Sequence, residues 1–443
     1  MRVLLIAEAA NPEWTSVPLV GWSHAMAIAR VTDAHLVTQV RNREAIERSG
    51  LAKGAYTCID SEAVAGSMYR LGAKLRGGAG KGWTTLMAAA SVSYYYFERL
   101  LWKEFGGRIK AGEFDVVHRI TPLSPTVPSP IAARCARAGV PFVVGPLNGG
   151  VPWPREFDSE RRREKEWLSY VRGAYKLLPG YRSTRSAARA ILIGSRDTWK
   201  QMPERYHDKC VYLPENAIDP ARFSKRVEGE AGSPLRAAFL GRLVPYKGAD
   251  MLIEAAAPLI RDGRVVLDII GDGPEMARLK ELVAKGGLES GVSLPGWIEH
   301  AKVQERLCRS DVFAFPSIRE FGGGVVLEAM ALGLVPLVVD YGGPAELVTS
   351  ETGFKVAIGP RERVIAGFRA ALERLSANPG IVRPIGDRAR ERVLRHFTWD
   401  AKARQVMEVY RWVLGQRAKP QEADLFPALP SSGLDAGPAR SRA

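Results

Sequence analysis

The sequence predicts an α/β protein built from two Rossmann-like, doubly wound domains that face each other across a cleft. Three observations support this fold class. The chain has 443 residues, which is too long for one ordinary hydrophobic core. Short β-branched runs alternate with helical patterns in both halves, as expected for parallel sheets covered by helices on both faces. Between the halves, residues 213–234 are rich in proline, glycine and charge, which is typical of an interdomain linker.

The first half contains five apolar runs with the length of buried strands. We expect strands at Val3–Ala7, His35–Val40, Asp115–His118, Pro141–Gly145 and Ile191–Gly194. Helical patterns predict helices at Ala25–Arg30, Thr84–Phe105 and Ile131–Ala138. Continuous apolar runs of this kind are typical of parallel strands that are covered on both faces.

The second half repeats the alternation more clearly. We expect strands at Ala237–Leu240, Val265–Ile270, Val312–Phe315 and Leu334–Val339. Helices are predicted at about 248–261, 275–286, 325–332, 361–376 and 399–414. These elements divide the chain into an N-terminal domain (1–217), a C-terminal domain (218–398), a helix that crosses back to the first domain (399–416) and a disordered tail (417–443).

Composition excludes several classes of protein. The chain is 46% apolar and 25% charged, which is ordinary for a globular protein and unlike a disordered or collagen-like one. It contains no run of about 18 apolar residues that could span a membrane. The four cysteines lie at least 75 residues apart, so neither a disulfide framework nor a zinc knuckle is indicated. The short apolar run at the start resembles no signal peptide, and we expect a cytoplasmic protein.

The positive charge is concentrated in the first half. Residues 1–226 carry 34 Lys and Arg against 21 Asp and Glu, an excess of +13 in a chain whose net charge is +15. Such a surface attracts a polyanion, either a nucleic acid or an anionic membrane. No nucleic-acid-binding motif is visible, so the membrane is favoured. The segments 70–102 and 157–178, which combine cations with Trp and Tyr, predict peripheral contact at the inner face of the cell membrane.

Two loops of the second half follow buried strands and carry glycine. In the first, Gly241 ends a strand, Arg242 follows it, and Lys247 lies where the next helix begins. Two cations beside a helix N-terminus favour an anion, although solvated cations at a strand exit are the alternative interpretation. In the second loop, Gly271 and Gly273 would allow close approach of a ligand or a tight turn.

A third loop carries the strongest signal. Glu320 and Phe321 precede Gly322, Gly323 and Gly324, and a helix is predicted from Val325. Successive backbone amides at this helix start suit a diphosphate. Glu328 interrupts an otherwise apolar run, where it can accept two hydrogen bonds from the diol of a ribose; the alternative is an exposed side chain on an amphipathic helix.

The first half offers candidate residues at two predicted strand ends and at the opening of the first helix. His118 and Arg119 end one strand, and Asn148 and Gly149 belong to a tight loop after another. Near the first strand, Gly21 and His24 flank Ser23, a plausible helix N-cap. We expect His118 to face the cleft as a hydrogen-bond donor and the others to line the acceptor side, although packing histidines are common.

Several familiar motifs are absent from the sequence. Residues 77–84 resemble a phosphate-binding loop but lack the G-x-x-x-x-G-K-[ST] spacing and follow no strand. The loop after the first strand lacks the dinucleotide-binding glycines. There is no D-x-D, H-x-H or H-E-x-x-H pattern, so we expect no metal site and no cofactor.

Taken together, these motifs resemble the family 4 (group 1) glycosyltransferases of the GT-B fold, bacterial type. The resemblance runs from about 216 to 414. It rests on Gly-Arg-x₄-Lys-Gly at 241–248, Gly-Asp-Gly-Pro at 271–274, the E-x₇-E pair Glu320 and Glu328, and Phe-Thr-Trp-Asp at 397–400. The sequence departs from the family in having three glycines after Phe321 and only Gly21 near the first loop.

The resemblance implies transfer of a sugar from a nucleotide diphosphate sugar to a saccharide or lipid-linked acceptor, with retention of configuration and without a metal. Arg242, Lys247 and the glycine-loop amides would stabilise the leaving diphosphate. His118 and Glu320 would hold the donor sugar, and Glu328 the ribose. A nucleotide-sugar epimerase or another nucleotide-dependent enzyme on a similar scaffold, and a non-catalytic binding protein, are the alternatives.

Overall fold

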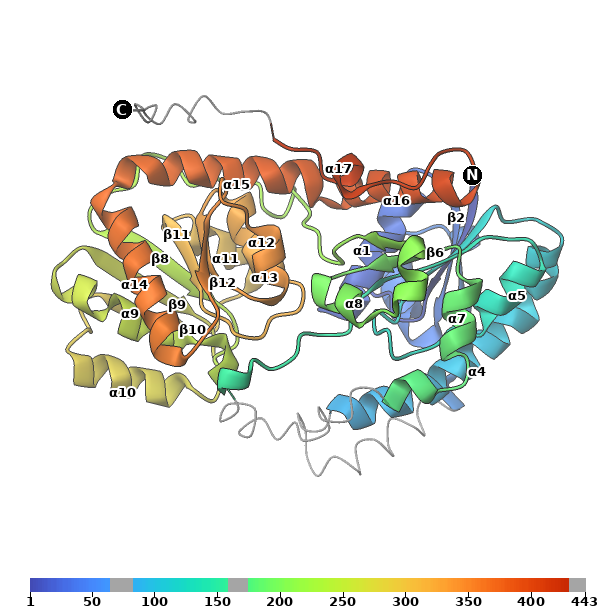
Figure 1. Cartoon of the computed structure of the whole chain (residues 1–443), viewed down its shortest axis with the longest axis horizontal. Coiled ribbons are helices and arrows are strands. Elements are labelled where there is room, and N and C mark those ends of the chain that lie inside the picture. The colour runs from blue at the N-terminus through green and yellow to red at the C-terminus, as the bar shows by residue number, and fades with distance from the viewer. Residues whose placement is uncertain (64–82, 158–173, 430–443) are drawn as a thin grey trace, which may run out of the picture.

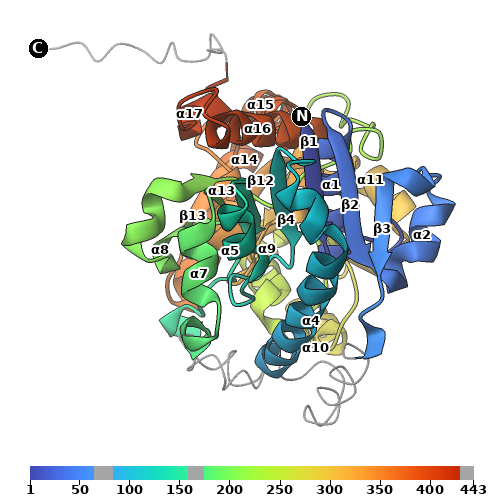
Figure 2. The ribbon, with the colours of Figure 1, turned by 90° about the vertical axis from the view of Figure 1, so that its right-hand side faces the viewer.

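The computed structural model describes residues 1–63, 83–157 and 174–429. Residues 70–81 and most of 157–178, where we expected membrane contact, lie outside this part of the chain, as do residues 430–443. Figure 1 shows two α/β domains side by side, with a pair of C-terminal helices running along one edge of both. Figure 2 is turned by 90° and looks onto the first domain, with the second domain behind it.

The first domain is built on a seven-stranded parallel sheet with the order β3-β2-β1-β4-β5-β6-β7. Its strands are β1 (Arg2–Ala7), β2 (Asp33–Gln39), β3 (Tyr56–Ile59), β4 (Val116–Thr121), β5 (Phe142–Leu147), β6 (Ala190–Ile193) and β7 (Cys210–Tyr212). Its helices are α1 (Val17–Ala29), α2 (Arg43–Arg48), α4 (Trp83–Lys110), α5 (Ile131–Arg137), α7 (Tyr181–Ala187) and α8 (Arg196–Gln201).

The second domain has a six-stranded parallel sheet with the order β10-β9-β8-β11-β12-β13. Its strands are β8 (Leu235–Leu240), β9 (Val265–Ile270), β10 (Val292–Gly296), β11 (Val312–Phe315), β12 (Val335–Asp340) and β13 (Phe354–Ala357). Its helices are α9 (Ala249–Arg261), α10 (Met276–Gly286), α11 (His300–Leu307), α12 (Gly324–Ala331), α13 (Gly342–Leu347), α14 (Arg361–Ala377) and α15 (Val382–His396). The predicted fold class is confirmed.

Side chains alternate between the two faces of the first sheet. Leu4 and Ile6 pack in a core with α4 and α5, whereas Val3 and Leu5 pack on the other face with α1. This second face is also covered by α16 (Trp399–Val413), whose buried residues include Tyr410. The last long helix of the chain therefore completes the core of the first domain, because each face of a parallel sheet needs apolar cover.

The segment that follows β5 packs in the second domain. Trp153 and Phe157 are buried in the core of the second domain, although they follow a strand of the first. The Trp153 ring contacts the Tyr246 ring edge-to-face, with centroids 6.0 Å apart, and Tyr341 Oη donates to the carbonyl oxygen of Pro152 at 2.8 Å. The chain therefore connects the domains here, within the part expected to be purely N-terminal.

Two sequence predictions are wrong at the level of local structure. Ser23 does not cap a helix, because α1 begins at Val17, with Pro18 in its first turn, and Ser23 lies in its middle. Residues 417–429 are not disordered: α17 (Glu422–Leu425) begins with a capping box, Leu425 is buried, and the Phe426 ring stacks on Phe397. A few apolar side chains hold this polar segment: Leu425 packs in the core of the first domain, and the Phe426 ring contacts both Tyr212 and Phe397.

Candidate functional site

The loops after β8 and β9 pack directly on each other at the carboxyl edge of the second sheet. A Cβ atom on Gly271 would lie 1.9 Å from the carbonyl oxygen of Gly241, and one on Gly273 would lie 2.4 Å from that of Leu243. Leu243 donates its amide to the carbonyl oxygen of Asp272 at 2.9 Å. Glycine is therefore needed for the contact between the two loops, which carries Arg242 toward the edge where open α/β sheets bind ligands.

The structure brings two of the predicted catalytic residues into direct contact. Lys247 Nζ forms an ion pair with Glu320 Oε2, and both side chains are largely buried. The ammonium group also lies 5.0 Å from the centre of the Phe315 ring. Arg242 is exposed and has no ion pair with any described residue. The loop after β8 thus carries two cations, Lys247, which Glu320 holds in place, and Arg242, which is exposed.

The glycine loop after β11 turns into α12 at Gly323. This residue has a φ of 64°, in the left-handed region that favours glycine, and a Cβ atom there would approach Pro344 N to 3.2 Å. The helix begins at Gly324, so the amides of Gly324 and Val325 have no acceptor within the helix. These amides and the helix dipole favour an anion at this point.

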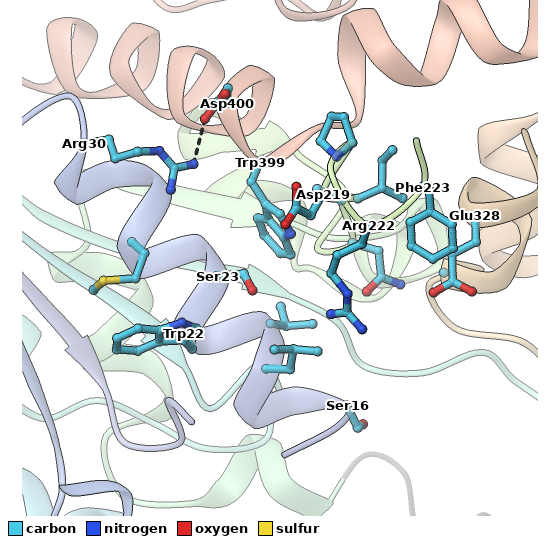
Figure 3. Close-up of a pocket in the computed structure, with 18 residues that line it drawn as sticks. Ser16, Trp22, Ser23, Arg30, Asp219, Arg222, Phe223, Glu328, Trp399 and Asp400 are labelled. Carbon is cyan, nitrogen blue, oxygen red and sulfur yellow. Dashed lines mark hydrogen bonds and ion pairs between the residues drawn. The ribbon is translucent and has the colours of Figure 1, made fainter. Parts of the chain in front are cut away.

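Glu328 lies one turn further along α12 and points into a cavity of about 530 Å³ between the domains (Figure 3). The cavity is bounded by α1 of the first domain, by the linker residues 216–223, by the start of α12 and by Trp399. Arg222 of the linker also points into it (Figure 3). A volume of this size and a lining of mixed polarity suit a small polar ligand such as a nucleoside.

At the far end of this cavity, the Arg30 guanidinium donates to Asp400 Oδ1 at 2.6 Å. This pair links α1 to the first turn of α16. Because both partners are more than half exposed, the ion pair adds little stability. It closes the cavity toward the C-terminal helices.

The loop after β5 meets the glycine loop across the domain boundary. Gly150, next to the predicted residues Asn148 and Gly149, packs on Phe321: a Cβ atom on Gly150 would lie 3.1 Å from that ring. The amide of Gly149 donates to Thr198 Oγ1 at 2.8 Å. Of the residues predicted on the acceptor side, Asn148 and Gly149 directly precede this contact with the second domain, although Gly149 itself packs on Pro125, Thr198 and Gln201 of the first.

His118 does not face the cleft, which corrects the sequence prediction. It is fully buried, with Nδ1 2.6 Å from Tyr410 Oη on α16 and Nε2 2.8 Å from the carbonyl oxygen of Gly145. Burial lowers its pKa to about 4. The physical reason is the length of β4: the strand continues to Thr121, so His118 lies inside it and not at its end.

The other three first-half candidates are also buried inside the fold. Arg119 is buried and donates to the carbonyl oxygens of Val127 and Pro122. His24 on α1 is buried against the Trp399 ring of α16, and burial lowers its pKa well below the usual value. A Cβ atom on Gly21 would lie 2.1 Å from the carbonyl oxygen of Ala9, so this glycine serves helix packing.

Sequence reasoning missed several residues at the domain boundary. Arg319 lies over both the Trp153 and Phe321 rings, with its guanidinium carbon 4.9 Å and 5.3 Å from their centres. Glu215 is buried and accepts hydrogen bonds from Asn148 Nδ2. The sequence does show a carboxylate at Glu215, between Pro214 and Asn216. Because these residues belong to the predicted linker, we expected that side chain to be exposed.

The described residues contain no group of three or more His, Cys, Asp or Glu side chains arranged to hold a metal ion. In the same part of the chain, no helix combines the length and the apolar character needed to cross a bilayer.

Comparison with known sequences identifies the second domain. Residues 221–391 match the family model described as "Glycosyl transferases group 1". The chain is 30% identical over 199 residues to the amylovoran biosynthesis glycosyltransferase AmsK of Erwinia amylovora, covering 43% of this chain and 48% of that protein. It is 32% identical over 243 residues to alpha-maltose-1-phosphate synthase of Mycolicibacterium smegmatis, covering 51% and 62%. The chain thus spans about half to three fifths of these curated relatives.

Comparison with solved structures extends the likeness to both domains. Anabaena HepE in complex with UDP superposes with a TM-score of 0.56 at 16% identity, covering 92% of this chain and 99% of that one. Sucrose-phosphate synthase from Thermosynechococcus elongatus gives 0.58 at 16% identity, covering 94% and 100%. The chain has the GT-B fold, and residues 221–391 of its second domain match the group 1 glycosyltransferase model.

Proposed function

We propose that this protein is a retaining glycosyltransferase that moves a sugar from a nucleotide diphosphate sugar to a saccharide or lipid-linked acceptor in cell-surface polysaccharide or glycolipid synthesis. The observation that carries the proposal is the Lys247–Glu320 ion pair beside the start of α12. Similarity to polysaccharide biosynthesis enzymes such as AmsK supports the general role. An epimerase is not favoured, because AmsK is named as a glycosyltransferase and the Mycolicibacterium relative as a synthase.

In the proposed reaction, negative charge grows on the diphosphate as the glycosidic C–O bond breaks. Arg242, Lys247 and the amides of Gly324 and Val325 would stabilise that charge, which is the role a divalent metal has in other transferases. Glu320, once Lys247 turns to the diphosphate, would accept hydrogen bonds from the donor sugar hydroxyls. In the front-face route, the leaving diphosphate takes the acceptor proton, so the chain needs no separate base.

Donor binding tests this proposal most directly. The full chain is screened by thermal shift against UDP- and GDP-sugars, beginning with UDP-glucose. A donor at 100 times its Kd would raise the unfolding free energy by about 2.7 kcal/mol. Turnover with a bound donor and a mixture of oligosaccharide or lipid-linked acceptors then follows, and the anomeric configuration of the product is read by NMR. An inverted product would contradict the retaining mechanism.

Membrane association is a separate part of the proposal. The excess of +13 in residues 1–226 supports a peripheral position on an anionic surface, where each cation near the membrane contributes about 1 kcal/mol. Co-sedimentation with vesicles should rise with the fraction of anionic lipid and fall with salt, because the Debye length is only about 8 Å at physiological ionic strength. Absence of binding at low salt would indicate a soluble polyanionic acceptor instead.

A further inference from the structure

Glu215 places a buried carboxyl group at the junction of the two domains. It lies just after β7, and its side chain is 7% exposed. Asn148 Nδ2 donates to both of its oxygens, at 2.8 Å and 2.7 Å. The proposed reaction assigns no role to this carboxyl group. Burying a charged group this deeply costs desolvation free energy. Its presence here therefore suggests a role other than stability.

The carboxyl group touches a loop from each domain. A Cβ atom on Gly194, at the end of β6, would lie 2.5 Å from Glu215 Oε2. One on Gly322, in the glycine loop of the second domain, would lie 2.1 Å from Asn216 Nδ2 and 2.7 Å from Glu215 Oε1. A side chain at Gly194 would displace the carboxyl group, and one at Gly322 would displace both the carboxyl group and the neighbouring Asn216 amide. Glu215 is therefore wedged between the first domain and the loop proposed to hold the diphosphate.

Asn148 extends this contact into the loop after β5. Its Oδ1 accepts a hydrogen bond from the amide of Gly150 at 3.0 Å, and Gly150 in turn packs on Phe321. The acceptor-side loop and the glycine loop are thus joined twice, once through Gly150 and Phe321, and once through Asn148 and Glu215.

Two charged groups act on Glu215 from neighbouring elements. Lys402 on α16 is also buried, and its Nζ donates to the carbonyl oxygen of Pro214; burial lowers its pKa to about 7. Glu346 on α13 adds a negative charge. Burial raises the pKa of Glu215 to about 7 against the opposing effects of Asn148 and Lys402. The carboxyl group therefore changes its ionisation within the physiological pH range.

We propose that Glu215 is a positioning residue that couples the acceptor-side loop to the glycine loop, and that the coupling tightens when its carboxyl group ionises. Hydrogen bonds to a charged acceptor are stronger than those to a neutral one, so the carboxylate holds Asn148 more firmly than the acid does. The proposal rests on the proposed function only for the role of the two loops. The contacts themselves do not depend on it.

Amide hydrogen exchange of the full chain, with no nucleotide added, tests the coupling independently of activity. After correction for intrinsic rates, protection should rise about fivefold in the wild type between pH 6 and pH 8 at two amides: that of Gly150, which donates to Asn148, and that of Val326, which donates to the carbonyl oxygen of Gly323 in the glycine loop. Glu215→Gln resembles the protonated form and should show low, pH-independent protection. An Asn148→Ala background should remove the effect of Glu215→Gln. If Glu215→Gln keeps the wild-type pH dependence, the proposal is wrong.

Glu346→Gln is the matched control. Glu346 is a partly buried carboxyl group at the same domain boundary, but its hydrogen bonds come from Tyr212 Oη at 2.7 Å and from the amide of Arg196 at 2.8 Å, and not from either loop. This variant should keep the pH-dependent protection, with a lower midpoint because Glu215 loses a negative neighbour. Equal loss of protection in both variants would indicate general loosening of the boundary and overturn the specific role of Glu215.

Turnover supplies the second readout and separates the two proposals. With a donor found by thermal shift, kcat/KM of the wild type should rise about fivefold through pH 7, whereas that of Glu215→Gln should stay at the low-pH level of the wild type. If the wild type turns over and Glu215→Gln has the same pH profile, the positioning role fails and the transferase stands. If no donor is turned over, the function fails and the exchange experiment still decides the role of Glu215.

Discussion

The two domains share one architecture but differ in what lies at the carboxyl ends of their strands. In the second domain, β8 and β11 end where the loops begin, so Arg242, Lys247 and Glu320 lie beyond the sheet. In the first domain, β4 continues past His118 and Arg119 and buries both. A polar residue after an apolar run therefore marks a site only when the strand really stops there.

The same contrast appears in how each domain completes its core. The second domain packs its strands against its own helices, with additions from residues 153–157 and the linker. The first domain needs α16, which returns from the other end of the chain, and Tyr410 Oη of that helix donates a hydrogen bond to His118 Nδ1. His118 of the first domain is thus used for assembly, whereas Lys247 and Glu320 of the second domain pair with each other beside the glycine loop.

The largest effect on activity is expected at the two cations of the second domain. Lys247→Ala and Arg242→Ala should each lower kcat/KM by about 10²-fold, or about 3 kcal/mol, because each cation stabilises charge that develops in the transition state. Steady-state kinetics measure the effect. Lys285→Ala, which removes an exposed cation on α10, is the control. Near-normal rates in both site variants would contradict the assignment of the donor site to this domain.

His118→Ala should act on stability and not on chemistry. Loss of a buried ring and its two hydrogen bonds should lower the unfolding free energy by about 2–4 kcal/mol, and kcat of the folded protein should stay within about twofold. Urea denaturation and kinetics separate the two quantities. A drop in kcat at unchanged stability would mean that the first domain contributes a catalytic histidine after all.

The pH dependence of that stability difference sharpens the test. The folded-state pKa of His118, about 4, lies below the usual 6.5, so the unfolded chain binds the proton more tightly. The stabilising effect of neutral His118 is complete above pH 6.5 and is lost as the pH falls toward 4. The difference between wild type and His118→Ala should shrink by up to about 3 kcal/mol over this range.

Glu328→Ala should affect binding more than turnover. If Glu328 holds a ribose diol in the cavity, its loss should raise the KM for the donor about tenfold, or about 1.4 kcal/mol, with kcat little changed. Glu362→Ala, at the exposed start of α14, provides a control in the same domain. An unchanged KM would mean that the cavity in Figure 3 does not hold the nucleoside.

The smallest expected effect is that of a chelator. If cations and backbone amides alone stabilise the diphosphate, turnover in EDTA should equal turnover without it. Activity that is lost in EDTA and restored by Mg²⁺ or Mn²⁺ would contradict the proposed metal-free site.

The sequence alone determined the fold class and every interior strand of both sheets. Interior strands are buried on both faces, so their continuous apolar runs are visible without a structure. The four outer strands, β3, β7, β10 and β13, escaped prediction. Strands β10 and β13 alternate more and less buried positions, β3 has one buried residue in four, and β7 has only three residues, so none carries a long apolar run.

The sequence also identified the loops of the second domain, since glycines and charges close together in the chain stay close together in a loop. Only the tertiary structure decided the fate of residues whose partners lie far away. His118 is 292 residues from Tyr410, and Asn148 is 67 from Glu215. Whether a polar side chain faces the cleft or pairs inside the core depends on which distant element covers it, and no local pattern records that choice.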